Sequence, residues 1–194
     1  MKLVLATGNP HKVEELRLIL GPQLEGFELL AYDGPEPVED GETFAENALI
    51  KARAAAVHTG LPALADDSGI CVDALGGAPG IHSARYAGTR DDADNVRLLL
   101  QNLNGIDDRR AHFACAAALV VPGVPAMEVT KQGMWTGRVA LDPAGERGFG
   151  YDPVFVPDGL EVTSAELTAE EKNAISHRAR AFQAIMPRVR ELLR

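Results

Sequence analysis

The sequence predicts an α/β protein with a central mixed, twisted sheet flanked by helices. Short apolar strand patterns alternate with helical patterns in the first half of the chain. Two long strand patterns, residues 110–121 and 127–137, follow on either side of a turn at Pro122-Gly123, which indicates an antiparallel pair. The C-terminal part is helical. The 194 residues fit a single domain, residues 1–194, and suffice to bury a sizeable core.

The first elements are a buried strand, a helix and a second strand. Residues 2–6 form the first strand, and a helix follows to about residue 20, where Gly21-Pro22 stops it. Residues 27–32 form the second strand. Residues 33–41 contain too many prolines, glycines and acids for regular structure and are predicted to be a loop.

A capping box marks the next helix. Thr43 caps it, Glu46 lies at the third helical position, and the helix is expected to extend through Thr59. Residues 61–66 form a third strand. The segment Asp66-Asp67-Ser68-Gly69 is expected to turn sharply into a short strand at residues 70–72.

The second half begins with a helix over residues 92–103 and continues with the long strand pair. Glycines make residues 148–153 a constrained loop, and a short strand follows at residues 154–156. Two C-terminal helices follow, one capped by Thr168 with Glu171 and one opening near Ser176. Pro187 is expected to kink the second helix or to end its regular hydrogen bonding.

Charge and composition exclude several functions. The net charge is −9 and the pI about 5.0, which argues against a general nucleic-acid binder but not against a mononucleotide site. The first residues are too short an apolar run for a secretory signal, and the longest run, 113–121, is too short for a membrane span. Cys71 and Cys115 show no metal-binding spacing, so free thiols in a reducing cytoplasm are expected.

Two segments combine residues that suit phosphate and metal chemistry. A strand leads through Thr7-Gly8-Asn9 into a helix carrying Lys12, which favours an anion site at the helix N-terminus, although a tight turn with a solvent-exposed lysine fits equally well. Adjacent Asp66 and Asp67 point to opposite faces of a strand. We expect one to serve a metal ion such as Mg²⁺ and the other to organise the turn, and two further acids, Glu39 and Asp40, lie in the predicted loop.

Two further segments favour recognition of a flat ligand. Glycines flank Phe149, so its ring can approach a planar group, and Asp152 can accept a hydrogen bond from a base or ribose. His177 and Arg178 would occupy the first turn of a helix, where cations oppose the helix dipole unless they serve another purpose. An aromatic-filled turn and a solvated basic face are the alternatives.

Together these segments resemble the inosine triphosphate pyrophosphatase family, the Ham1-like non-standard purine nucleoside triphosphate pyrophosphatases, along nearly the whole chain. Tyr151 resembles the bacterial branch. The resemblance is carried by the following motifs: Leu5-Ala6-Thr7-Gly8-Asn9-x-x-Lys12, Thr43-Phe44-x-Glu46-Asn47-Ala48, Ala65-Asp66-Asp67-Ser68-Gly69, Leu75-Gly76-Gly77-Ala78-Pro79-Gly80-Ile81, Ser83-Ala84-Arg85-Tyr86, Gly148-Phe149-Gly150-Tyr151-Asp152-Pro153, Ala165-Glu166-Leu167 and Ser176-His177-Arg178.

The resemblance implies two lobes with a cleft between them, a homodimer, and cleavage of ITP, dITP and XTP to the monophosphate and pyrophosphate. It implies Mg²⁺ held by Asp67 and Glu39, with Asp67 activating water; Asp40 and Glu42 remain alternatives to Glu39. Phe149 would stack on the purine, and His177 with Arg178 would read the 6-oxo group. The substrate-binding residues implied are Thr7, Gly8, Asn9, Pro10, His11, Lys12, Ser68, Phe149, Gly150, Tyr151, Asp152, Lys172, His177 and Arg178.

Nucleotide-pool cleansing in the cytoplasm, with neither nucleic acid nor membrane as partner, is therefore the expected function. Adenine presents an amino group where hypoxanthine and xanthine present a carbonyl, so a donor facing that position would discriminate against ATP. Two alternatives remain open. One is a Maf-like pyrophosphatase for other modified nucleotides, and the other is a purine-nucleotide-binding module without turnover.

Overall fold

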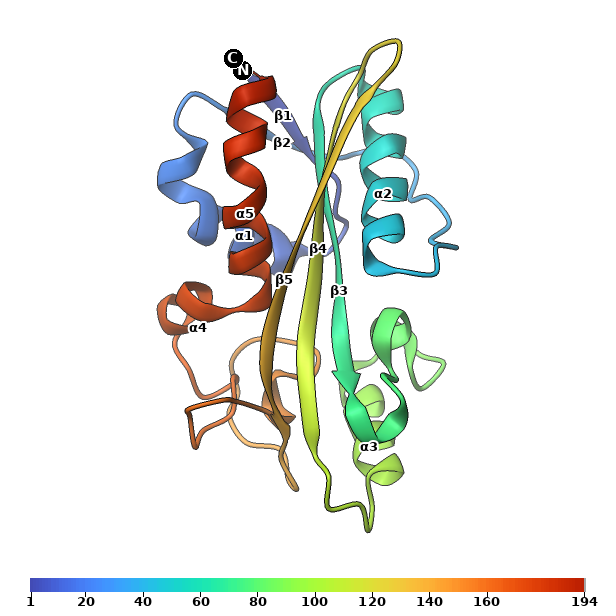
Figure 1. Cartoon of the computed structure of the whole chain (residues 1–194), viewed down its shortest axis with the longest axis vertical. Helices are drawn as coiled ribbons and strands as arrows, with labels where there is room; N and C mark the ends of the chain where they lie inside the picture. Colours follow the sequence, from blue (N-terminus) through green and yellow to red (C-terminus); the bar gives the residue numbers. More distant parts are fainter. Residues whose placement is uncertain (194) are drawn as a thin grey trace. The chain divides into compact units, whose positions relative to one another are not determined.

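The computed structural model describes residues 1–193, apart from the side chains of Pro10 and Pro22. Six strands form one sheet in the order β2-β1-β3-β4-β5-β6 (Figure 1). β1 is parallel to β2 and to β3, whereas β5 and β6 are antiparallel, so the predicted mixed α/β architecture is confirmed. The strands are β1 (Lys2–Leu5), β2 (Glu28–Ala31), β3 (Ala63–Val72), β4 (Arg110–Val121), β5 (Met127–Val139) and β6 (Phe155–Pro157).

The helices follow the capping signals in the sequence. Thr43 and Glu46 form the capping box that begins α2, and Thr168 with Glu171 forms another at α4. No helix in residues 1–193 combines the length and apolar character needed to cross a bilayer. The helices are α1 (Pro10–Leu20), α2 (Phe44–Thr59), α3 (Asp92–Asn102), α4 (Ala169–Ile175) and α5 (His177–Leu192).

Helix α5 continues past Pro187 to Leu192, so this proline does not end the helix. A proline inside a helix removes one backbone hydrogen bond and costs about 3 kcal/mol. Ile185, Met186 and Val189 lie on both sides of it and are fully buried in the core. The burial of these side chains offsets the missing hydrogen bond.

The chain divides into two compact units. Unit 1 comprises Met1–Asp67, Cys115–Gly133 and His177–Arg194, and unit 2 comprises Ser68–Ala114 and Met134–Ser176. β3 contributes residues to both units.

Unit 1 has a separate apolar core on each face of its strands, because successive strand residues point in opposite directions. On one face, Leu3, Leu5 and Leu64 pack with side chains of α1 and α5. On the other face, Val4 and Ala63 pack against the alanine-rich surface of α2. The faces of β3 therefore meet different helices, α1 and α5 on one side and α2 on the other (Figure 1).

Unit 2 has its own core of aliphatic and aromatic side chains. Trp135 is buried there, and its ring centroid lies 6.5 Å from that of Phe113 and 5.3 Å from that of Phe155. Trp135 is therefore a packing residue. Elsewhere in this unit, the side chain of Arg109 donates hydrogen bonds to the backbone carbonyls of Leu103, Val139 and Ala140 at 2.6–3.1 Å.

The predicted turn at Asp66-Asp67-Ser68-Gly69 is wrong, because β3 runs without interruption from Ala63 to Val72. Gly69 is required for close packing within unit 2. A Cβ at this position would lie 2.4 Å from the carbonyl oxygen of Gly80 and 2.4 Å from Oγ of Ser83. The glycine therefore marks a close approach of backbone to an extended strand, as glycines inside strands often do.

Candidate active site

The loop between β1 and α1 presents the N-terminus of α1. The side-chain oxygen of Asn9 caps this helix by accepting the N–H of His11 at 2.9 Å, and the N–H of Asn9 donates to Oγ1 of Thr7 at 3.2 Å. The first turn of α1 contains no acidic residue of its own to offset the positive end of the helix dipole. Lys12 adds a charge in the same turn, which makes this end of α1 suited to an anion.

Gly8 lets the loop pass close to an acidic side chain. A Cβ on Gly8 would lie 2.4 Å from Oε1 of Glu36. His11 is exposed, and the backbone of Pro10 begins α1 while its side chain lies outside the described part of the chain. The structure therefore places the six predicted phosphate-binding positions in a single short loop and helix turn, as their sequence spacing implied.

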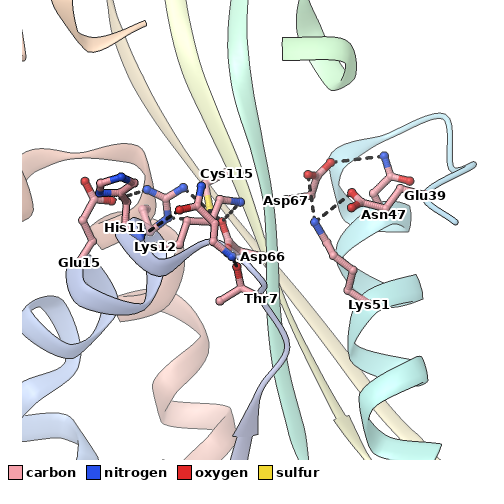
Figure 2. A network of polar contacts seen from close by, with 12 residues as sticks. Thr7, His11, Lys12, Glu15, Glu39, Asn47, Lys51, Asp66, Asp67 and Cys115 are labelled. Atoms are coloured by element: carbon pink, nitrogen blue, oxygen red, sulfur yellow. Dashed lines mark hydrogen bonds and ion pairs between the residues drawn. The ribbon is translucent and has the colours of Figure 1, made fainter. Parts of the chain in front are cut away.

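Asp66 lies at the centre of a buried ion network on the face of β3 that meets α1 and α5. Its Oδ2 lies 3.0 Å from Nζ of Lys12 and 3.3 Å from both Nε and Nη2 of Arg178. Nη1 of Arg178 is bound by the carboxylate of Glu15, and Sγ of Cys115 lies 3.8 Å from Oδ2 of Asp66. Figure 2 shows Lys12, Glu15, Asp66 and Cys115 gathered on one side of the strand.

The charges of this network balance one another. Burial alone would raise the pKa of Asp66, but Lys12 and Arg178 outweigh burial and hold the pKa of this carboxyl well below its usual range. Burial would likewise lower the pKa of Arg178, whereas the carboxylates of Asp66 and Glu15 raise it. Arg178 and Asp66 therefore both stay ionised although they are 2% and 1% exposed.

Asp67 points to the opposite face of β3 and meets α2 (Figure 2). Nζ of Lys51 lies 3.2 Å from Oδ1 of Asp67 and 3.0 Å from Oε2 of Glu39. Nδ2 of Asn47 donates to Oδ2 of Asp67 at 3.3 Å. The prediction that the two aspartates point to opposite faces is therefore confirmed. The expectation that the second aspartate organises a turn is wrong, because Asp66 lies within a continuous strand and binds Lys12 and Arg178.

Burial raises the pKa of Asp67, and the nearby carboxylate of Glu39 adds to this effect, while Lys51 and Lys12 oppose it. Burial by itself would lower the pKa of Lys51, but Asp67, Asp66 and Glu39 together raise it. Lys51 is therefore kept charged by the surrounding acids, whereas burial makes ionisation of Asp67 costly. A perturbed carboxylate beside cations is the kind of arrangement that active sites use.

Glu39 and Asp67 fit a Mg²⁺ ion in number and chemistry. Both carboxylates reach one cationic group, Nζ of Lys51, so both lie within range of a single positive charge. Within residues 1–193 no group of three or more His, Cys, Asp or Glu side chains could form a cage for a metal. Mg²⁺ commonly binds through one or two carboxylates and completes its shell with water and substrate phosphates, which matches this pair.

Two further side chains, of Lys51 and Asn47, contact Asp67 and were not among the site residues predicted from the sequence. Both lie on α2 four positions apart, so they share a face of the helix. This face meets Asp67, beside the alanines of α2 that pack against the strands. A charged and an amide side chain on the otherwise alanine-rich, buried side of this helix was the available signal.

In unit 2, Asp152 organises the loop that carries Phe149. Its Oδ2 accepts the N–H of Phe149 at 2.9 Å and lies 2.6 Å from Nζ of Lys172, and its Oδ1 accepts a hydrogen bond from Oγ of Ser164 at 2.8 Å. Nζ of Lys172 also lies 5.1 Å from the centroid of the Phe149 ring. Asp152 thus uses both oxygens within the protein.

Backbone geometry explains the glycine before Phe149. Gly148 has φ of 76°, and a Cβ there would lie 2.1 Å from Oδ2 of Asp152. The N–H of Gly150 donates to Oδ2 of Asp92 at 2.6 Å, and the buried hydroxyl of Tyr151 donates to the carbonyl of Ser83 at 2.8 Å. The loop is therefore held at successive residues and presents a half-buried Phe149 ring.

The structure distributes the predicted site residues between the two units. Unit 1 contains the Thr7–Lys12 loop, the two proposed metal ligands, His177 and Arg178; unit 2 contains the others. His177 is the first residue of α5 and is buried. Asp66 and Glu15 explain how a helix can begin with buried Arg178 despite the helix dipole. The members in unit 2 are Ser68, Phe149, Gly150, Tyr151, Asp152 and Lys172.

Comparison with known proteins gives a consistent result over the whole chain. The model of the Ham1 family matches residues 3–188. A dITP/XTP pyrophosphatase of Leifsonia xyli subsp. xyli is 57% identical, covering 100% of this chain and 98% of that protein. Ham1 proteins of Coxiella burnetii and Staphylococcus aureus, 42% and 35% identical, each superpose with a TM-score of 0.88 over 98% of this chain and 99% of theirs. The chain therefore belongs to the Ham1 family.

Proposed function

We propose that this protein is a nucleoside triphosphate pyrophosphatase that hydrolyses ITP, dITP and XTP to the nucleoside monophosphate and pyrophosphate. The observation that carries the proposal is the arrangement around β3, where Lys12 and Lys51 meet acids on the two faces of one strand. The family membership and the name of the Leifsonia xyli relative, a dITP/XTP pyrophosphatase, support the same reaction.

The proposed roles in unit 1 follow from charge and position. The N-terminus of α1 and Lys12 bind phosphate oxygens and offset the negative charge that develops on the pyrophosphate leaving group. Asp67 accepts the proton of the attacking water, and Lys51 and Asn47 hold its two oxygens in place. Asp67 and Glu39 would hold Mg²⁺, which would supply Lewis-acid neutralisation of phosphate charge when bound.

The proposed role of the unit 2 group is to bind the base. The Phe149 ring is fixed through its own N–H and by the neighbouring Gly150, so a purine can stack on a preorganised surface. Asp152 and Lys172 support this ring as a buried ion pair. His177 and Arg178 are proposed to recognise the 6-oxo group, and Ser68 and Tyr151 to contact substrate.

The proposal extends to the setting in which the enzyme works. We propose that the chain acts as one domain over residues 1–194, forms a homodimer, uses Mg²⁺ and works in the cytoplasm on the free nucleotide pool, without nucleic-acid or membrane partners. The family match over residues 3–188 supports a single functional domain. The free cysteines are consistent with a reducing cytoplasm, and the net charge of −9 argues against nucleic acid as a partner.

A substrate panel tests the proposed function. With Mg²⁺ present, pyrophosphate release is expected from ITP, dITP and XTP at a kcat/KM at least about 100-fold above that for ATP, because a donor that faces adenine is left unpaired. Chelation of the metal should abolish release. Comparable rates on ATP and ITP would contradict the purine specificity, and preferred hydrolysis of dUTP, dTTP or a methylated base would favour a Maf-like enzyme. Binding of ITP without turnover would favour a binding module.

Phe149→Ala is expected to raise the KM for dITP about tenfold, since stacking of a base on an aromatic side chain contributes about 1–3 kcal/mol. Phe149→Tyr keeps the ring and is the matched control, with a KM close to that of the wild type. Steady-state kinetics measures both values. If Phe149→Ala lowered kcat and left KM unchanged, the proposed stacking role would be wrong.

A further inference from the structure

Asn47 joins two segments that each carry one of the proposed metal ligands. Its side chain is buried and lies in the first turns of α2. Nδ2 donates to Oδ2 of Asp67 at 3.3 Å, and Oδ1 accepts the backbone N–H of Gly41 at 2.9 Å. One amide therefore connects β3, which carries Asp67, with the loop that carries Glu39 two residues before Gly41.

The orientation of this amide follows from its partners. A backbone N–H can only donate, so the atom that meets Gly41 must be the amide oxygen. The amide nitrogen is then directed at the carboxylate of Asp67, which can only accept when ionised. Both ends of the Asn47 amide are therefore hydrogen-bonded. An ionised aspartate at this position has no N–H to donate to Asp67, and a leucine could bind neither partner.

The loop before α2 is built to reach Asn47. A Cβ on Gly41 would lie 2.8 Å from Oδ1 of Asn47 and 2.7 Å from Cβ of Glu46, so only glycine allows this approach. The next two N–H groups, of Glu42 and Thr43, donate to Oε2 of Glu46 at 2.7 and 3.1 Å. Three successive backbone donors are therefore bound by two neighbouring side chains of α2.

The anchored segment begins at Gly41, two residues after Glu39. The Glu39 carboxylate is about one-third exposed and forms an ion pair with the side chain of Lys51. The Gly41–Asn47–Asp67 connection is thus a second link between the segment that carries Glu39 and Asp67, beside the two ion pairs of Lys51.

We propose that Asn47 is a positioning residue that sets the separation of the Glu39 and Asp67 carboxylates for a divalent cation. This inference rests on the proposed function, in which these two acids bind Mg²⁺. Asn47 itself touches neither metal nor substrate in this scheme. Groups that orient metal ligands commonly change metal affinity 10–100-fold when they are removed.

Binding of Mn²⁺ to the substrate-free protein tests the proposal without relying on catalysis. The free Mn²⁺ signal in electron paramagnetic resonance gives the Kd for the wild type and for Asn47→Ala. We expect Asn47→Ala to raise this Kd about tenfold or more. The Mg²⁺ concentration that gives half-maximal dITP hydrolysis should rise by a similar factor, with kcat at saturating Mg²⁺ reduced less than kcat at low Mg²⁺.

Asn95 provides a matched control for the loss of a buried, doubly bonded asparagine. Its side chain is buried, Oδ1 accepts the N–H of Ala87 at 2.8 Å, and Nδ2 donates to the carbonyl of Ala84 at 3.3 Å. Asn95→Ala should lower Tm to a similar extent as Asn47→Ala but leave the Mn²⁺ Kd within about twofold of the wild type. A Mn²⁺ Kd raised equally by both variants would overturn the proposal.

The other outcomes also decide it. A Kd unchanged in Asn47→Ala, or a wild-type protein that binds no Mn²⁺, would overturn the positioning role. If Asn47→Ala does not fold, Gly41→Ala answers the same question, because the added Cβ disrupts the loop side of the connection while Asn47 and Asp67 stay intact. A wild type that binds Mn²⁺ but releases no pyrophosphate from dITP would contradict the proposed function and leave this inference standing.

Discussion

Asp67→Asn is expected to lower kcat for dITP hydrolysis about 10³-fold or more, because it removes both the proton acceptor and a negative ligand of the metal. The fold should be retained. Burial already makes ionisation of Asp67 costly, so a neutral side chain of the same shape removes an unfavourable charge from the unit 1 interior. Pyrophosphate release and thermal unfolding, measured on the same preparation, check both expectations.

The neighbouring aspartate provides the control for this variant. Asp66→Asn changes the same functional group one residue earlier on β3, but on the face where Lys12 and Arg178 need its charge. We expect this variant to lower Tm clearly and to reduce kcat less than Asp67→Asn does. Activity of Asp67→Asn within tenfold of the wild type, or a larger loss of kcat in Asp66→Asn, would show that the catalytic carboxylate has been assigned to the wrong face.

The sequence predicted local features well because their causes are local. The capping box at Thr43, the loop at residues 33–41 and the opposite directions of Asp66 and Asp67 depend on neighbours within a few residues or on the geometry of a strand. The turn predicted at Gly69 failed because the reason for this glycine is distant in sequence. It makes room for the backbone of Gly80 and the side chain of Ser83.

The same distinction applies to the candidate site. The loop leading to Lys12 was identified because a strand followed by a helix N-terminus is a local anion site. Lys51 and Asn47 were not identified because their acidic partners Asp67 and Glu39 lie 12–20 residues away, and only the fold brings them together. Propensity and periodicity place α2, but they do not state which strand residue its polar side chains will meet.

Arg178→Ala is expected to lower the free energy of unfolding by about 3–5 kcal/mol, the usual effect of breaking a buried ion pair by removing one partner. Arg178 is 2% exposed, and its guanidinium contacts Asp66 through two nitrogens and Glu15 through the third. Its loss leaves Asp66 with Lys12 as the remaining cation in direct contact. Denaturant unfolding of the wild type and the variant measures the difference.

A double-mutant cycle with Asp66→Asn separates the cost of the pair from the cost of the orphaned charge. If the penalty arises from leaving Asp66 uncompensated, the double variant should be destabilised by clearly less than the sum of the two single variants, because residues in direct contact couple. Additive effects would mean that Arg178 stabilises unit 1 mainly through its packing.

The Arg178→Ala variant also tests the proposed base recognition. Loss of the preference for ITP over ATP supports it, whereas an equal fall of kcat/KM for both substrates would show that Arg178 serves catalysis only by holding Asp66 and, through it, Lys12.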